Sequence, residues 1–128
     1  MRDIVHNIKT VQAIVPAVLA ASANGAAIDL KGVGSVAIVL NTGAIEAAGD
    51  FTAKLQESDT TTSGDFADVD ASHVMGELPA SLAANSVVKV GYRGFKRYVR
   101  VVLTKNGGTS IAAGAVAVMG YVQDRPVA

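Results

Sequence analysis

The side chains that could carry out catalysis are few and scattered in this sequence of 128 residues. The chain has two histidines, His6 and His73, and no cysteine, so a zinc site with several imidazole or thiolate ligands is not expected. Glu77 follows His73 closely, but the sequence offers no nucleophile with an orienting partner beside this pair. No serine stands in a nucleophile-elbow pattern. We therefore predict that the protein is not an enzyme.

Carboxylates gathered in the middle of the chain raise the question of a calcium site. Asp65, Asp68 and Asp70 lie close together in the sequence, with Glu57 and Asp59 before them. Calcium needs about six to eight oxygen ligands, and this spacing does not match the EF-hand loop. We expect instead that Asp59 and Asp65 bracket a loop of Thr, Ser and Gly whose side chains bond to backbone amides. No metal site is predicted.

The charges are balanced overall but segregated along the chain. Eleven basic residues match eleven acidic ones. Residues 46–77 hold eight acids and one base, whereas residues 89–105 hold six bases and no acid. The two segments could neutralise each other within one domain. Alternatively, the acidic edge of one copy could meet the basic edge of the next copy. Charge pairs of that kind would fix the alignment of the two copies more than they would add affinity. The bases are Lys89, Arg93, Lys96, Arg97, Arg100 and Lys105.

A third explanation of the basic segment is nucleic-acid binding. Three aromatic and three arginine side chains alternate there, in a pattern that resembles a platform for stacking bases. Against it, the same segment reads as a core strand, and the sequence pI of about 6.7 lacks the strongly basic footprint of such binders. We therefore expect no nucleic-acid partner. The six residues are Tyr92, Arg93, Phe95, Arg97, Tyr98 and Arg100.

The elements that must position these side chains are predicted to be short β-strands separated by turns. Apolar and polar residues alternate in residues 26–30 and 51–57, as in half-buried strands. Residues 35–40 are apolar on both faces, which suits a central strand covered on both sides. Residues 96–104 give the strongest strand pattern, with Val99, Val101 and Leu103 on one face. Residues 87–90 and 111–122 are the remaining predicted strands, with a turn at residues 91–94.

Two segments could be helical. Residues 10–23 are rich in alanine, but Pro16 lies in their middle and favours an extended edge strand; the alternative is a short helix that ends before Pro16. Residues 78–84 could form a short helix, with Pro79 in its first turn.

Residues 111–122 are too short for a membrane-spanning helix, which needs about 20 residues, so no membrane partner is predicted. Residues 1–9 lack the pattern of a signal peptide.

These patterns predict one all-β domain over residues 1–128. We expect a single-domain antiparallel β-sandwich, jelly-roll-like, with an extended N-terminal arm and at most one short helix. Residues 1–9 and 124–128 are predicted to be flexible or docking tails. Half of the residues are hydrophobic but only 5% are aromatic, so the core should be thin and should leave no room for a large cofactor.

Blocks of the sequence resemble a family of small head-associated virion proteins of tailed bacteriophages and prophages. The blocks are "NIKTVQAIVPAV" with "IDLKGVGSVAIVL", "FTAKLQESDTTTSGDFADV", and "VGYRGFKRYVRVVLT" running to a C-terminal "RPVA". The resemblance covers nearly the whole chain. The sequence departs from the family at the alanine-rich residues 44–48 and 112–117. No property of the family's loops is therefore inferred for this chain. The resemblance implies a capsid decoration, or cement, protein in the virion, bound to the outer capsid surface and made in the host cytoplasm.

Such a protein would bind the major capsid protein and act as a homo-oligomer, either a trimer or a dimer. For capsid docking we single out Arg2, Ile4, Val5 and Ile8. For contact between copies we single out Asp65, Asp68, Tyr98 and Arg100. One alternative is a host-surface or glycan-binding appendage whose loop at residues 58–66 contacts sugar, although Phe66 is the only aromatic residue of that loop. The other alternative is a head-tail connector component.

Overall fold

The protein is built from β-strands, as its sequence predicts. The computed structural model describes residues 3–122, and of residues 121 and 122 the backbone alone. In this part of the chain there are ten strands and two single-turn 3-10 helices. The strands are β1 (Lys9–Leu19), β2 (Ala23–Asn24), β3 (Ile28–Asp29), β4 (Val33–Glu46), β5 (Asp50–Ser58), β6 (Ala67–Asp68), β7 (Val74–Met75), β8 (Val87–Tyr92), β9 (Tyr98–Gly107) and β10 (Ser110–Val122); the helices are η1 (Ser63–Asp65) and η2 (Ala71–His73).

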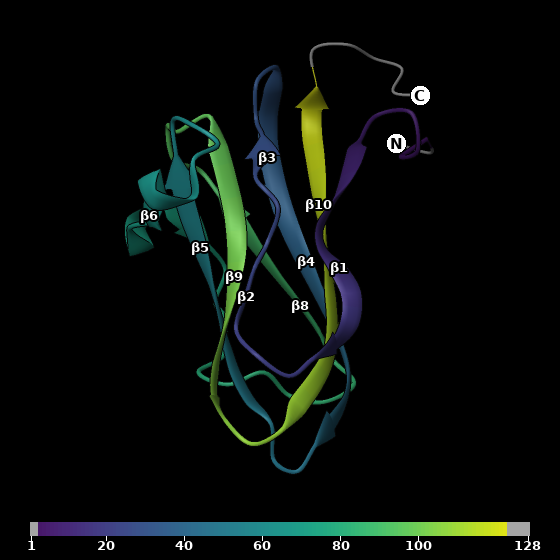
Figure 1. Cartoon of the computed structure of the whole chain (residues 1–128). Coiled ribbons are helices and arrows are strands. Elements are labelled where there is room, and N and C mark those ends of the chain that lie inside the picture. Colours follow the sequence, from purple (N-terminus) through teal and green to yellow (C-terminus); the bar gives the residue numbers. More distant parts are fainter. Residues whose placement is uncertain (1–2, 123–128) are drawn as a thin grey trace.

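The strands form two antiparallel sheets that face each other (Figure 1). The first sheet has the order β1-β10-β4-β8-β7, and the second has the order β2-β9-β5-β6, with β3 also paired to β9. When β2 and β3 are counted as one interrupted strand, consecutive long strands alternate between the sheets in the way of a jelly roll. The predicted antiparallel sandwich is therefore confirmed, and so is its jelly-roll character.

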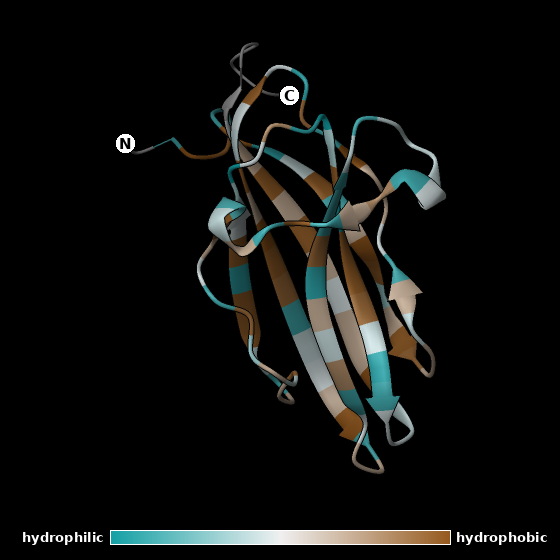
Figure 2. Cartoon of the chain, turned by 90° about the vertical axis from the view of Figure 1, so that its left-hand side faces the viewer, coloured by the Kyte–Doolittle hydropathy of each residue, from teal (hydrophilic) through white to brown (hydrophobic). Residues whose placement is uncertain are grey.

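The core lies between the sheets and consists mainly of small aliphatic side chains. Phe51, Ala53 and Leu55 point inward from β5, as their spacing predicts, and meet residues from β4 and β10. Figure 2 shows hydrophobic and hydrophilic bands alternating along the strands. This is the period of two that places successive side chains on opposite faces of a sheet. Phe51 is the one fully buried phenylalanine among the described residues.

The extended interpretation of residues 10–23 is confirmed. β1 runs at the edge of the first sheet and pairs with β10. Its register shifts between Gln12 and Ile14 and again between Ile14 and Ala17, and the second shift contains Pro16. Proline has no backbone donor and is tolerated in sheets at edges and bulges. The strand therefore bends at Pro16 and does not become a helix.

Among the predicted strands whose limits differ in the structure are residues 26–30 and 87–90. Of residues 26–30 only Ile28–Asp29 is a strand, because the Ala26 amide donates to the carbonyl of Ala13 in the opposite sheet. β8 continues beyond residue 90 to Tyr92, so the predicted turn at residues 91–94 begins after Tyr92. Both differences arise from pairing with distant strands, which local patterns do not contain.

The prediction that residues 35–40 are covered on both sides is wrong. Val36, Ile38 and Leu40 of β4 are buried in the core, whereas Ala37 and Val39 are only half-buried. β4 is central in its sheet, but its outer face is covered by no other layer of the described chain. An apolar outer face thus remains accessible.

The predicted helix at residues 78–84 is also wrong. This segment is an irregular strap in which Leu82 is buried and its amide donates to the carbonyl of Phe51. The hydroxyl of Thr42 donates to the carbonyl of Ala83, at 2.6 Å, and the hydroxyl of Thr52 donates to the carbonyl of Ala80. These bonds to β4 and β5 use backbone groups that a helix would need for itself. The strap instead closes the core with Leu82.

The two ends of the described chain lie at the same end of the sandwich. Residues 3–8 precede β1 and contain a turn, so the predicted N-terminal arm begins as a structured segment. The predicted tail at residues 124–128 lies outside the described residues. Among the described residues there is no helix with the length and apolar character needed to cross a membrane.

Candidate functional site

The N-terminal residues predicted to dock on a capsid form a compact turn. The Asp3 carboxylate accepts hydrogen bonds from the amide of His6, at 3.1 Å, and lies 2.8 Å from His6 Nδ1. The Asn7 amide group donates to the carbonyl of Asp3, and the Asn7 backbone amide donates to the carbonyl of Ile4. The hydrogen bond from the His6 side chain lowers the pKa of Asp3 below its usual value. Four local bonds thus hold this turn.

The turn displays two branched aliphatic side chains to solvent. Ile4 is 55% exposed and Val5 is 73% exposed. Ile8 is half-buried at the start of β1, and Arg2 lies outside the described residues. Because the polar side chains of the turn bond within it, Ile4 and Val5 form an apolar tip on a polar base. Exposed aliphatic side chains such as these gain free energy when a partner covers them.

Arg100, one of the four residues predicted to join copies, is buried by its own chain. Its guanidinium donates to the side-chain carbonyl of Gln56, at 2.7 and 3.0 Å, and to the hydroxyl of Ser63. The ring of Phe66 lies 4.3 Å from the guanidinium carbon, at cation–π distance. The segment that holds η1 therefore covers the outer face of the second sheet at Arg100. A contact between copies would involve the neighbours of Arg100 and not its own side chain.

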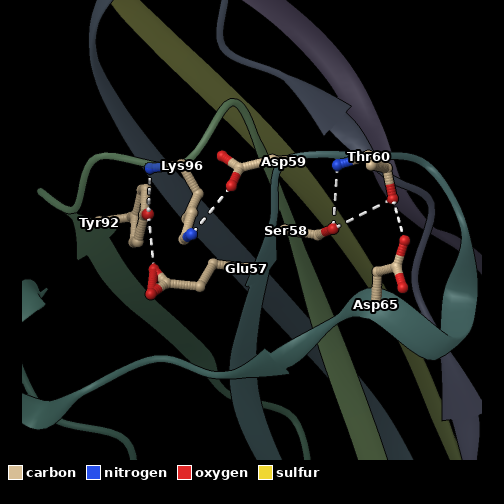
Figure 3. Close-up of polar contacts among 7 residues, drawn as sticks. All are labelled: Glu57, Ser58, Asp59, Thr60, Asp65, Tyr92 and Lys96. Atoms are coloured by element: carbon tan, nitrogen blue, oxygen red, sulfur yellow. Dashed lines mark hydrogen bonds and ion pairs between the residues drawn. The ribbon is translucent and has the colours of Figure 1, made fainter.

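The other three residues of that group lie nearby but do not form one surface cluster. Asp68 bonds to Lys54 and Gln56, and both bonds lower its pKa. Asp65 accepts a hydrogen bond from the hydroxyl of Thr60, at 2.7 Å (Figure 3). Tyr98 is half-buried, with the guanidinium of Arg97 over its ring. Their role between copies stays a prediction.

A polar network ties the β8–β9 loop to the end of β5. The Tyr92 hydroxyl donates to a Glu57 oxygen at 2.7 Å and accepts from the amide of Lys96, and Lys96 Nζ pairs with Asp59 at 2.9 Å (Figure 3). Burial and the bond to Glu57 raise the pKa of Tyr92 to about 12. The Ser58 hydroxyl accepts from the amide of Thr60, as expected for a loop that satisfies its own backbone.

The segregated charges meet within the chain at one described ion pair. Lys96 and Asp59 join the basic and acidic segments. Within the acidic segment, Lys54 pairs with Asp68. The guanidinium of Arg97 donates two hydrogen bonds to the Asp29 carboxylate, each 2.9 Å long. These bonds lower the pKa of Asp29 to about 2. Neutralisation within one domain thus explains part of the segregation.

His73 does not meet the carboxylate that its sequence neighbourhood suggests. Its ring packs edge-on against Phe95, with 5.4 Å between ring centroids, and its Nδ1 atom is buried with no described hydrogen-bond partner. No group of three His, Asp or Glu side chains within residues 3–120 converges as metal ligands would. The platform considered for nucleic acids is also not assembled, because Tyr92 and Arg100 are buried in different parts of the sandwich.

The outer face of the first sheet carries an open apolar groove that the sequence analysis missed. Its volume is about 600 Å³, and it follows β1, β10 and β4. Val18 is 69% exposed and Val116 is 39% exposed at its walls. The signal in the sequence was the apolar second face of residues 35–40, which is free and not covered. The lining includes Pro16, Val18, Val39, Asn41, Ala112, Gly114 and Val116.

Comparisons with known proteins identify no family for this chain. No protein-family model matches the sequence, and no curated protein matches it either. A similar solved chain comes from the structure of infectious bursal disease virus Gx strain, with 14% identity and a TM-score of 0.43. The match covers 93% of the present chain and 33% of the viral chain, so the present chain spans about a third of that chain's length. Identity this low says nothing of what the present chain binds.

Two apolar surfaces are accessible: the tip at Ile4 and Val5, and the groove on the outer face of the first sheet. The polar groups of the β8–β9 loop and of the end of β5 are engaged in hydrogen bonds and ion pairs with each other. Association with another macromolecule is the chemistry that such surfaces support.

Proposed function

We propose that this protein is a structural component of the virion that binds the outer surface of a tailed-phage capsid and stabilises contacts between major capsid subunits. The observation that carries the proposal is the N-terminal turn, which presents Ile4 and Val5 outward on a base fixed by Asp3, His6 and Asn7. The resemblance of the sequence blocks to head-associated proteins supplies the partner. The protein has no catalytic role in this proposal.

The proposed mechanism is mechanical. Burial of one Ile or Val side chain on the capsid contributes about 1.5–3 kcal/mol. A single turn therefore gives modest affinity, but several copies held together make dissociation much slower, because each released arm rebinds before the others let go. Capsid subunits spanned by such an assembly would separate only after these contacts break.

The test compares binding to heads that lack the protein. Heads produced without the gene are mixed with purified protein, pelleted and analysed for bound copies. We expect many copies of the wild-type protein per head and at least about tenfold weaker binding of the Ile4→Ser/Val5→Ser variant. Val87→Ser is the matched control, since Val87 is 67% exposed but lies on β8, away from the turn.

The mechanical role has a separate readout. Heads reloaded with the wild-type protein should release DNA at a higher temperature than bare heads, followed by dye fluorescence on heating. Unchanged DNA release would remove the stabilising role and leave display alone. Absence of binding by the wild-type protein, or a few copies at one vertex, would overturn decoration altogether.

A further inference from the structure

An exposed aromatic side chain lies near one end of the first sheet, and the groove extends toward the other end. Phe95 is 90% exposed in the loop between β8 and β9. The loop lies beside the first residues of β4, since Tyr92 pairs with Val36, whereas the groove reaches Thr42 and Gly43 near the end of β4. Phe95 therefore cannot reach the groove of its own chain.

The loop holds Phe95 outward in a fixed position. The amide of Arg93 donates to the carbonyl of His73, and Arg93 Nε donates to the carbonyl of Ser72. The Lys96 amide donates to the Tyr92 hydroxyl, and the ring of His73 supports Phe95 edge-on. A loop whose backbone is already held by hydrogen bonds loses little conformational entropy when it binds, which favours affinity.

The groove fits an aromatic side chain. Its lining includes the small residues Gly43, Ala112 and Gly114, and the Pro16 ring packs directly over Gly114, where a Cβ atom would be 2.9 Å from the ring. Val18 and Val116 stand at its walls, and its volume is about 600 Å³. Of the residues that line it none is charged. An apolar ring is therefore a suitable occupant, whereas a charged side chain is not.

One pair of opposite charges links the two places, although Lys89, the cross-strand neighbour of Val39, adds a positive charge beside the groove. Arg93 is exposed beside Phe95, and it has no carboxylate within ion-pair distance among the described residues. Glu46 is exposed near the far end of the groove, because it pairs with Ser110, two residues along β10 from Ala112. Among the described residues Glu46 also has no ion pair. Opposite charges of this kind fix the orientation of a complex.

We propose that Phe95 of one copy of this chain inserts into the groove of a second copy, in a head-to-tail contact. Such a contact joins two different surfaces, so each copy keeps one free Phe95 or one free groove, and assembly continues until a ring closes. The inference goes beyond capsid docking, which uses residues 3–7, so either proposal can fail without the other.

The test measures self-association of the purified full chain by sedimentation equilibrium. For an interface this small we expect a dissociation constant on the order of 0.1 mM, with masses that rise above 13.0 kDa as concentration increases. Phe95→Ser and Val18→Asp should each weaken association at least about tenfold. Val5→Ser, on the exposed N-terminal turn and not among the residues that line the groove, should associate as the wild type does. Circular dichroism confirms that each variant is folded.

Mixing the two defective variants gives the decisive result. Phe95→Ser keeps an intact groove and Val18→Asp keeps an intact Phe95, so an equal mixture should form dimers that grow no further. A mixture that stays monomeric would show that Phe95 of one copy does not occupy the groove of another, and would overturn the proposal. A wild-type chain that stays monomeric at about 1 mM, or a Phe95→Ser variant that associates normally, would overturn the proposal.

Discussion

At the residue scale, Tyr92 is a side chain whose hydroxyl group is held in a buried polar contact. It is buried, yet its hydroxyl both donates to Glu57 and accepts from the Lys96 amide. Tyr92→Phe removes both bonds and leaves Glu57 without this donor. A hydrogen bond to a charged group contributes about 1.5–3 kcal/mol, so we expect a loss of that size in the free energy of unfolding, measured by urea denaturation at neutral pH.

The same residue gives a pH dependence with a definite sign. The pKa of Tyr92 is about 12 in the folded chain against 10.0 for its usual value. The stability that this shift contributes is fully present below pH 10 and is lost as pH rises toward about 12. Tyr92→Phe should remove this part of the alkaline decline. Tyr98→Phe is the control, because no described hydrogen bond uses the Tyr98 hydroxyl, and an equal effect there would contradict the assignment.

At the element scale, the connection from β4 to β5 is a tight turn with unsuitable residues. The Gly49 amide donates to the carbonyl of Glu46, and the two central residues, Ala47 and Ala48, have φ values of 48° and 57°. Positive φ at both central positions favours Asn-Gly. The left-handed conformation costs a residue such as alanine about 1–2 kcal/mol. Ala47→Asn/Ala48→Gly should therefore raise the free energy of unfolding by about 1 kcal/mol.

A matched substitution separates turn geometry from a general effect of glycine. Ala44 is exposed in β4 and is not among the residues of positive φ. Ala44→Gly should lower stability by about 0.5–1 kcal/mol, because glycine weakens a strand. Thermal melting of both variants is the measurement. Stabilisation by Ala44→Gly, or destabilisation by the double change in the turn, would show that backbone strain is not stored at residues 47 and 48.

At the scale of the whole molecule, the two sheets are joined at Gly25. Its amide donates to the carbonyl of Val101 in the second sheet, and the next amide, of Ala26, donates to the carbonyl of Ala13 in the first. A Cβ atom at Gly25 would lie 2.6 Å from the Val101 oxygen and 2.7 Å from the Ala13 oxygen. Gly25→Ala must separate the sheets locally, and we expect a loss of about 2–4 kcal/mol in unfolding free energy.

The control for this change is Gly64→Ala. A Cβ atom at Gly64 would meet nothing within 4 Å, so its effect should stay within about 0.5 kcal/mol. Urea unfolding of both variants gives the comparison. Equal stability of Gly25→Ala and the wild type would mean that the sheets tolerate a wider gap at this corner.

Local patterns in the sequence were enough to predict where the long strands lie and which of their faces point inward. Alternation placed Phe51, Ala53 and Leu55 in the core, and Pro16 kept β1 extended, because both effects act within a few residues of the chain. The charge pattern likewise predicted that acidic and basic segments could lie side by side, as Lys96 and Asp59 do.

Only the tertiary structure decided which surfaces stay free. Arg100 has the pattern of a solvent-facing residue, yet Gln56 and Phe66 cover it, and residues 78–84 give up a helix for hydrogen bonds to β4 and β5. The outer face of β4, expected to be covered, stays open as a groove. Whether a face of a strand is exposed depends on which segment from far along the chain packs against it. The alternation of apolar and polar residues along the strand contains no information about that distant segment.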